Sequence, residues 1–189
     1  DIPARVVNLL LAEKGLIKKH IRGWLLTAKG KGLGGQQQEA ESGIPFVTWP
    51  ETILDEPDVI NSLLQIAGDE GLGGQAALDG HSVNNAMQRR VNNWLYLACV
   101  VHARDYRLLW DLDSAVADFY IPEAELCVEC WADQLAQETN RAAVLSGELE
   151  KHVIYQKYKV AYVEFHDENI HQVDEILARE LLRRGVAVY

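Results

Sequence analysis

Residues 116–131 read Val-Ala-Asp-Phe-Tyr-Ile-Pro-Glu-Ala-Glu-Leu-Cys-Val-Glu-Cys-Trp. A short β-rich run lies on each side of the proline, which predicts two strands joined as a hairpin at residues 122–125. If the hairpin turns at the middle of that connection, Asp118 lies directly opposite Glu129, with the Cβ atoms about 5 Å apart. Facing carboxylates destabilise a strand pair. A shared proton, or a divalent cation that takes oxygen ligands from both side chains, would offset the repulsion.

This pattern, Asp-Phe-Tyr-Ile-Pro followed after a short gap by Val-Glu-Cys-Trp, resembles the Asp…Glu-x-Lys core of the PD-(D/E)XK nuclease superfamily. It is most similar to the branch of very-short-patch-repair-like nucleases and helicase-associated nuclease domains, in which a tryptophan such as Trp131 often replaces the lysine. The resemblance covers roughly residues 82–185. It implies hydrolysis of DNA phosphodiester bonds with Mg²⁺ or Mn²⁺ held by Asp118, Glu129 and the backbone carbonyl of Cys130.

The resemblance implies two further site residues. In this branch the lysine moves to the next helix, with a tyrosine four residues later, and Lys151 and Tyr155 match that spacing. Lys151 would position the attacking water, although an ion pair with Glu148 on the same helix face is an alternative. The first helix of such cores carries a glutamate near the metal, and Gln88 stands at that position.

Gln88 leaves a second function open, because an amide brings no charge and should weaken metal binding. The alternative is a nuclease fold without catalysis, which serves as a binding or assembly module in a nucleic-acid-processing complex. An acidic second half of the chain also favours that alternative, since a net negative surface repels nucleic acid.

The sequence divides into two regions, residues 1–75 and residues 76–189. The first region is expected to be a small helical region with a Gly- and Gln-rich linker. Its expected elements are a helix at 3–14, a helix at 16–27, the flexible linker at 29–43 and a helix that starts near Pro57 and stops at Gly68. A second Gly-rich connection is expected at 69–80.

The second region has the element order of the nuclease core, which implies an α/β fold: a restriction-endonuclease-like mixed sheet flanked by helices. Its expected elements are a helix at 84–97, a strand at 100–110, the hairpin, a helix at 140–158, a strand at 160–165 and a last helix that ends before Gly185. On the first of these helices the polar residues, Arg89, Arg90, Asn92 and Asn93, are expected to face outward.

Charge is distributed unevenly along the chain. The net charge is −10, but residues 1–32 carry seven Lys and Arg against two acidic residues. This segment is therefore the better electrostatic candidate for DNA binding, with help from Arg89, Arg90, Arg104 and Arg107. Its two expected helices could equally dock a protein partner. No apolar run reaches membrane-spanning length, so we expect a cytoplasmic protein.

Cysteines and histidines are not expected to form a site. The spacings Cys99-x-x-His102 and Cys127-x-x-Cys130 resemble zinc motifs. However, a strand points the two sulfur atoms of Cys127 and Cys130 to opposite faces, so we interpret the three cysteines as small buried hydrophobic residues. The other candidate acid–base groups, His152, His166 and His171, are interpreted as surface or structural residues.

Overall fold

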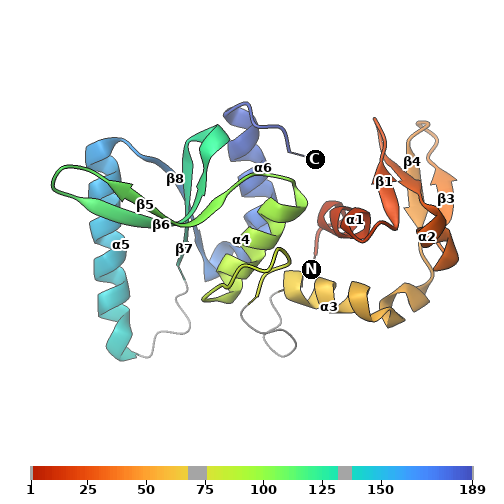
Figure 1. The fold of residues 1–189 in the computed structure, drawn as a ribbon, viewed down its shortest axis with the longest axis horizontal. Coiled ribbons are helices and arrows are strands. Elements are labelled where there is room, and N and C mark those ends of the chain that lie inside the picture. Colours follow the sequence, from red (N-terminus) through yellow and green to blue (C-terminus); the bar gives the residue numbers. More distant parts are fainter. Residues whose placement is uncertain (1, 68–75, 132–137, 189) are drawn as a thin grey trace.

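The computed structural model describes residues 2–67, 76–131 and 138–188. These described residues form a mixed α/β fold with one four-stranded sheet and two two-stranded sheets (Figure 1). The helices and strands are α1 (Ala4–Glu13), β1 (Ile17–Lys19), β2 (Trp24–Leu26), α2 (Ala28–Gly32), β3 (Gln36–Glu39), β4 (Pro45–Thr48), α3 (Pro57–Ala67), α4 (Ala86–Leu97), β5 (Ala103–Leu109), β6 (Ser114–Ile121), β7 (Leu126–Trp131), α5 (Glu138–Tyr158), β8 (Ala161–His166) and α6 (Val173–Arg183). No described helix is both long and apolar enough to cross a bilayer.

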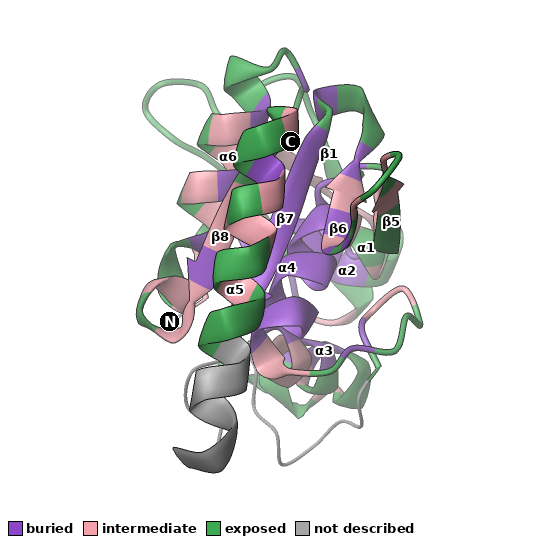
Figure 2. Ribbon diagram, turned by 90° about the vertical axis from the view of Figure 1, so that its left-hand side faces the viewer, coloured by how far each residue is buried: buried purple, intermediate pink, exposed green. Residues whose placement is uncertain are grey.

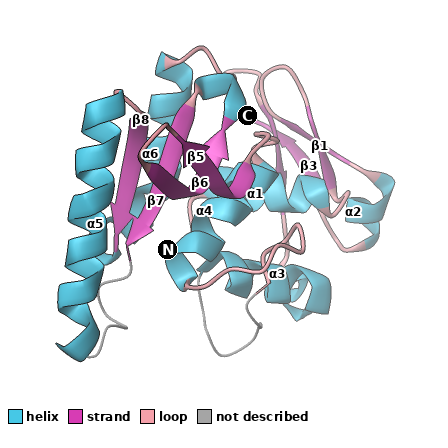
Figure 3. Cartoon of the chain, turned by 60° about the vertical axis from the view of Figure 1, so that its left-hand side comes forward, coloured by secondary structure: helices cyan, strands magenta, loops and turns pink. Residues whose placement is uncertain are grey.

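The four-stranded sheet has the order β5-β6-β7-β8. Strands β5, β6 and β7 are antiparallel neighbours, whereas β8 returns through α5 to pair parallel with β7. Helix α5 covers one face, where Tyr155 packs with Ala117 and Cys127. Helices α4 and α6 cover the other face, against Phe119 and Phe165 (Figure 3).

The register of the β6–β7 hairpin confirms the prediction from the sequence. Phe119 pairs with Val128, and Ile121 pairs with Leu126. A short 3₁₀ turn at Pro122–Ala124 joins the strands, and Glu125 adopts a left-handed conformation with φ of 47° to complete it. The ladder ends at the Phe119–Val128 pair, one residue short of the expected pair of Asp118 and Glu129.

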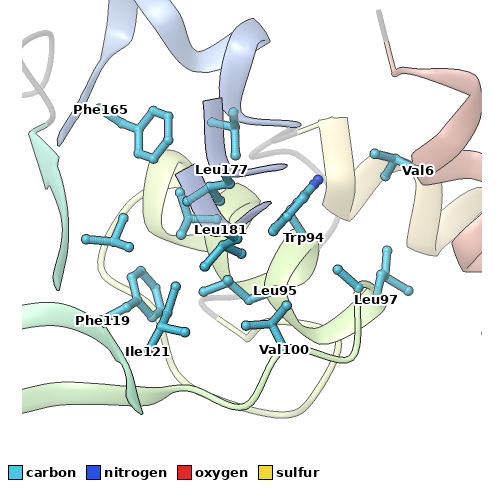
Figure 4. Close-up of a cluster of buried hydrophobic side chains, with 14 of the residues drawn as sticks. Val6, Trp94, Leu95, Leu97, Val100, Phe119, Ile121, Phe165, Leu177 and Leu181 are labelled. Carbon is cyan, nitrogen blue, oxygen red and sulfur yellow. The ribbon is translucent and has the colours of Figure 1, made fainter. Parts of the chain in front are cut away.

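Helix α4 is enclosed on all sides, and the expectation that its polar residues face outward was wrong. Arg89, Arg90, Asn92 and Asn93 are all buried. The sheet and α6 cover one side of α4, and α1 and α3 cover another (Figures 2 and 4). A helical pattern shows only that one face is polar, and here a neighbouring loop hydrogen-bonds to that face: the Asn93 Oδ1 accepts from the Leu78 N–H at 2.8 Å.

The N-terminal region is not wholly helical, contrary to the prediction. The expected helix at 16–27 is the β1–β2 hairpin, and the expected linker at 29–43 contains α2 and β3, which pairs with β4. Glycine serves here for close packing, since a Cβ at Gly30 would collide with the carbonyl of Leu16. The expected helix stop at Gly68 and the connection at 69–75 lie outside the described residues.

The N-terminal region and the rest of the chain share a hydrophobic core. Val6, Leu9 and Leu10 of α1 belong to the same buried cluster as Trp94 and Leu177 (Figure 4). The apolar face of α1 is therefore used within the chain, and the expected pair of N-terminal helices that could dock a protein partner is absent.

Candidate active site

The carboxylate of Glu129 lies between the four-stranded sheet and α5. Glu129 is 1% exposed. Its Oε2 accepts from the Lys151 ammonium at 2.6 Å, and its Oε1 accepts from the Tyr155 hydroxyl at 2.5 Å. Lys151 and Tyr155 are one helical turn apart and so share a face of α5. The structure therefore brings these two residues to one of the predicted acidic residues.

Asp118 on β6 is held by groups from two other elements. Its Oδ2 accepts from the backbone N–H of Cys130 at 2.7 Å. Its Oδ1 accepts from the Gln88 amide at 3.0 Å. The Gln88 Oε1 in turn accepts from the Asn84 N–H at 2.9 Å and from Arg104 at 3.4 Å. Gln88 therefore presents its NH₂ group to Asp118 as a hydrogen-bond donor.

Burial makes ionisation of both carboxylates unfavourable. Desolvation raises the pKa of Asp118, and the Cys130 N–H and Lys151 only partly oppose it. Desolvation also raises the pKa of Glu129, with Lys151 as the main opposing group and the negative charge of Asp118 adding to the rise. The two carboxylates and Lys151 are therefore close enough to act on one another electrostatically.

The charges around these carboxylates do not balance. Asp105 adds a third negative charge near Asp118. Arg104, which lies 3.4 Å from Asp105, adds a positive charge to that of Lys151. When all five groups are ionised, three negative charges face two positive ones. A bound divalent cation would change this local charge from −1 to +1 and would compensate the carboxylates for their lost solvation.

The donor set suits a hard divalent cation. Mg²⁺ and Mn²⁺ prefer carboxylate, carbonyl and water oxygens, and an ionised carboxylate keeps free lone pairs after two hydrogen bonds. In an extended strand the N–H and C=O of one residue point to the same side. Since the Cys130 N–H points to Asp118, its carbonyl faces the same side, and the residues present fit a cation held by Asp118, Glu129 and Cys130.

Trp131 and Arg104 have roles in this site that the sequence did not predict. The Lys151 ammonium lies over the Trp131 ring at 5.1 Å from its centroid, a cation–π contact that holds the lysine beside Glu129. The ion pair of Lys151 is with Glu129 rather than with Glu148. Arg104 pairs with Phe119, the neighbour of Asp118, across the β5–β6 ladder, so a strand alignment could have found it.

The thiols of the cysteines are structural, and the histidines of the sequence analysis make no hydrogen bond to Asp118 or Glu129 among the described residues. Cys127 and Cys130 are buried in different hydrophobic clusters, which confirms that they face opposite sides of the sheet. Cys99 is exposed, so its interpretation as a buried residue was wrong. It follows the end of α4 with φ of 55°, where the chain turns away from the core. His152 hydrogen-bonds to Glu164 at 2.7 Å.

Comparisons of the chain with protein-family models, with curated proteins and with solved structures find no match. The functional conclusion therefore depends on the arrangement of the side chains.

Proposed function

We propose that this chain is a metal-dependent nuclease that hydrolyses DNA phosphodiester bonds. The observation that carries the proposal is the ion pair of Lys151 with the buried Glu129, with Asp118 of the neighbouring strand near enough to act on both electrostatically. The order α4-β5-β6-β7-α5-β8 supports a restriction-endonuclease-like core. Such a core places paired carboxylates on adjacent strands and an amine beside them, which phosphodiester hydrolysis requires.

Each site residue has a defined task in this proposal. Asp118, Glu129 and the Cys130 carbonyl would hold Mg²⁺ or Mn²⁺, which supplies charge stabilisation at the scissile phosphate. Lys151 neutralises part of the charge of Glu129, and its ammonium would donate a hydrogen bond to the attacking water or to a phosphate oxygen. Gln88 is a positioning residue, because its amide fixes the Asp118 carboxylate.

The route of the DNA follows from the exposed basic residues. Arg89 and Arg90 are buried and do not reach phosphates, which corrects the expectation from the sequence. Arg107 on β5 is exposed and pairs with Val116, two residues before Asp118, whereas the exposed Lys18 and Lys19 lie on β1. Figure 1 places β1 and α5 at opposite ends of the longest axis, so a DNA that contacts both must extend along the molecule.

Metal dependence tests the proposal directly. The purified chain is expected to nick plasmid DNA or cut branched DNA with Mg²⁺ or Mn²⁺, and a chelator in excess is expected to stop cleavage. Ca²⁺ in place of Mg²⁺ controls for effects of ionic strength. Cleavage that continues undiminished in excess chelator would contradict a metal-dependent mechanism.

A second candidate function is a nuclease fold without catalysis that binds or assembles in a nucleic-acid-processing complex. The observation that favours it is Gln88, whose amide takes a position beside Asp118 and adds no negative charge. Calorimetric titration with Mn²⁺ separates the two functions. Heat from one bound ion that the Asp118→Ala variant loses supports the nuclease, whereas no binding at millimolar Mn²⁺ supports the inactive module.

Lys151 on α5 offers a sharper test of the nuclease proposal. Lys151→Gln is expected to reduce cleavage by about 10²-fold, the usual contribution of a group that assists proton transfer or orients water. The glutamine keeps a hydrogen-bond donor for Glu129 but removes the charge. Initial cleavage rates with saturating Mn²⁺ measure the effect.

The matched control for Lys151→Gln is Lys157→Gln. Lys157 lies on α5 as well and is ion-paired at 2.5 Å with Asp113, but it is half exposed. Its replacement is expected to leave the cleavage rate unchanged. Equal rates for the Lys151 and Lys157 variants, both folded by circular dichroism, would show that Lys151 has no catalytic role.

A further inference from the structure

We propose that Asp79, His81 and His102 form a separate binding site for a transition-metal ion, and that this ion is Zn²⁺. One ligand atom of each residue lies within 4.8 Å of the other two. The Asp79 Oδ2 is 3.0 Å from the His81 Nδ1 and 3.7 Å from the His102 Nε2. Tetrahedral zinc ligands at about 2.0–2.2 Å from the ion stand about 3.3–3.6 Å apart. The three side chains are thus spaced as ligands of one ion.

His102 carries the argument. Its side chain is only 6% exposed, and its Nδ1 donates to the backbone carbonyl of Val100 at 2.9 Å. Because a carbonyl oxygen can only accept, Nδ1 holds the proton and Nε2 keeps its lone pair. That Nε2 is buried, has no hydrogen-bond partner among the described residues, and faces Asp79. An imidazole whose Nδ1–H is bound to a carbonyl, with Nε2 free, is the form that ligates metals.

Asp79 is also held in place by hydrogen bonds. Its Oδ2 accepts from the Asn92 amide at 2.8 Å, and its Oδ1 accepts from the His81 N–H at 3.0 Å. Outer contacts of this kind orient metal ligands and raise metal affinity. The hydrogen bond to Asp79 also explains why a polar residue, Asn92, is buried on α4.

The loop that carries Asp79 and His81 is closed and tight. Ala76 and Ser82 form an antiparallel bridge at its base. Gly80 has φ of 86°, a conformation that side chains rarely adopt, and it lets the chain reverse between the two ligands. The ligand loop is therefore shaped before any ion binds, which reduces the entropy lost on binding.

The mixed donor set selects the ion. Two imidazoles and one carboxylate suit Zn²⁺, while Mg²⁺ prefers oxygen ligands alone. Burial lowers the pKa of His102, which keeps the imidazole neutral and able to bind a metal. Three protein ligands also leave a fourth position for water. Zinc here would fasten the loop before α4 to the residues that lead into β5.

Zinc titration of the tag-free, metal-stripped chain tests the site. Calorimetry is done with excess Mg²⁺, so that zinc does not compete for the proposed cation site at Asp118 and Glu129. The wild-type chain is expected to bind one Zn²⁺. The His81 side chain is half exposed, so His81→Ala removes a ligand without opening a cavity in the core. This variant is expected to lower the zinc affinity by more than the ~100-fold that loss of an outer partner can cause.

Two control variants separate this site from others. His171→Ala removes an exposed histidine outside the site, and Asp118→Asn alters the carboxylate site. Both are expected to keep wild-type zinc affinity, so the result is independent of the proposed nuclease activity. Co²⁺ bound in place of zinc should give the visible absorption of a four-coordinate ion in the wild type and lose it in His81→Ala. Equal zinc affinity of wild type and His81→Ala, or no zinc bound by the wild type, overturns the proposal.

Discussion

The Asp118→Ala protein is expected to cleave DNA at least ~10³-fold more slowly than the wild type, since loss of a metal ligand removes several kcal/mol of transition-state stabilisation. The Asp118 Oδ2 accepts from the Cys130 N–H, so the replacement also removes one hydrogen bond between β6 and β7. Burial raises the pKa of Asp118, which means that its charge does not stabilise the metal-free fold. Single-turnover nicking with Mn²⁺ measures the change.

The matched control is Asp111→Ala. Asp111 is an exposed aspartate in the turn between β5 and β6. Its removal is expected to leave the rate within a factor of about two of the wild type, because an exposed turn carboxylate contributes little to a distant reaction. Robust cleavage by the Asp118→Ala protein would show that Asp118 does not bind the catalytic metal.

The second large effect is on stability. Asp174→Ala is expected to lower the free energy of unfolding by about 2 kcal/mol, because it removes the acceptor of two hydrogen bonds in a partly buried charge network. The Asp174 Oδ1 accepts from Arg5 at 2.6 Å and from the Trp94 indole N–H at 2.5 Å. Its charge also supports Arg90, whose pKa burial lowers. Asp174 therefore ties α1, α4 and α6 together.

Urea denaturation measures this effect, with Glu175→Ala as the control. Glu175 is the next residue of α6, and its side chain is 78% exposed. Its replacement is expected to change the free energy of unfolding by no more than about 0.5 kcal/mol. Indistinguishable denaturation midpoints for the two variants would show that the Asp174 network does not stabilise the fold.

The sequence predicted the parts of the molecule that depend on near neighbours. Alternation and one proline were enough to place the β6–β7 hairpin in register, because pairing across a short turn is fixed by its length. The same register predicts that Asp118 and Glu129 face each other, one step beyond the last pair of the ladder. The position of Lys151 came from a resemblance, and the structure places its ammonium beside Glu129.

The parts that failed depend on what covers a surface. The polar side of α4 looked solvent-exposed because a helical period does not say which segments pack on it. Residues 16–27 looked helical because short apolar segments fit both a helix and a strand. The approach of Asp79 and His81 to His102 is set by a loop that packs across α4, and no local pattern reports that contact.

A helix with no solvent-facing side limits how this chain can be dissected. Because α4 takes its cover from α1 and α3 as well as from the sheet and α6, the first region is part of the structural support of the second. Expression of residues 76–189 alone would leave Trp94 and Leu97 uncovered, and such newly exposed apolar surface promotes aggregation. A loss of activity in such a shortened chain would then reflect the exposed core rather than the chemistry of its carboxylates.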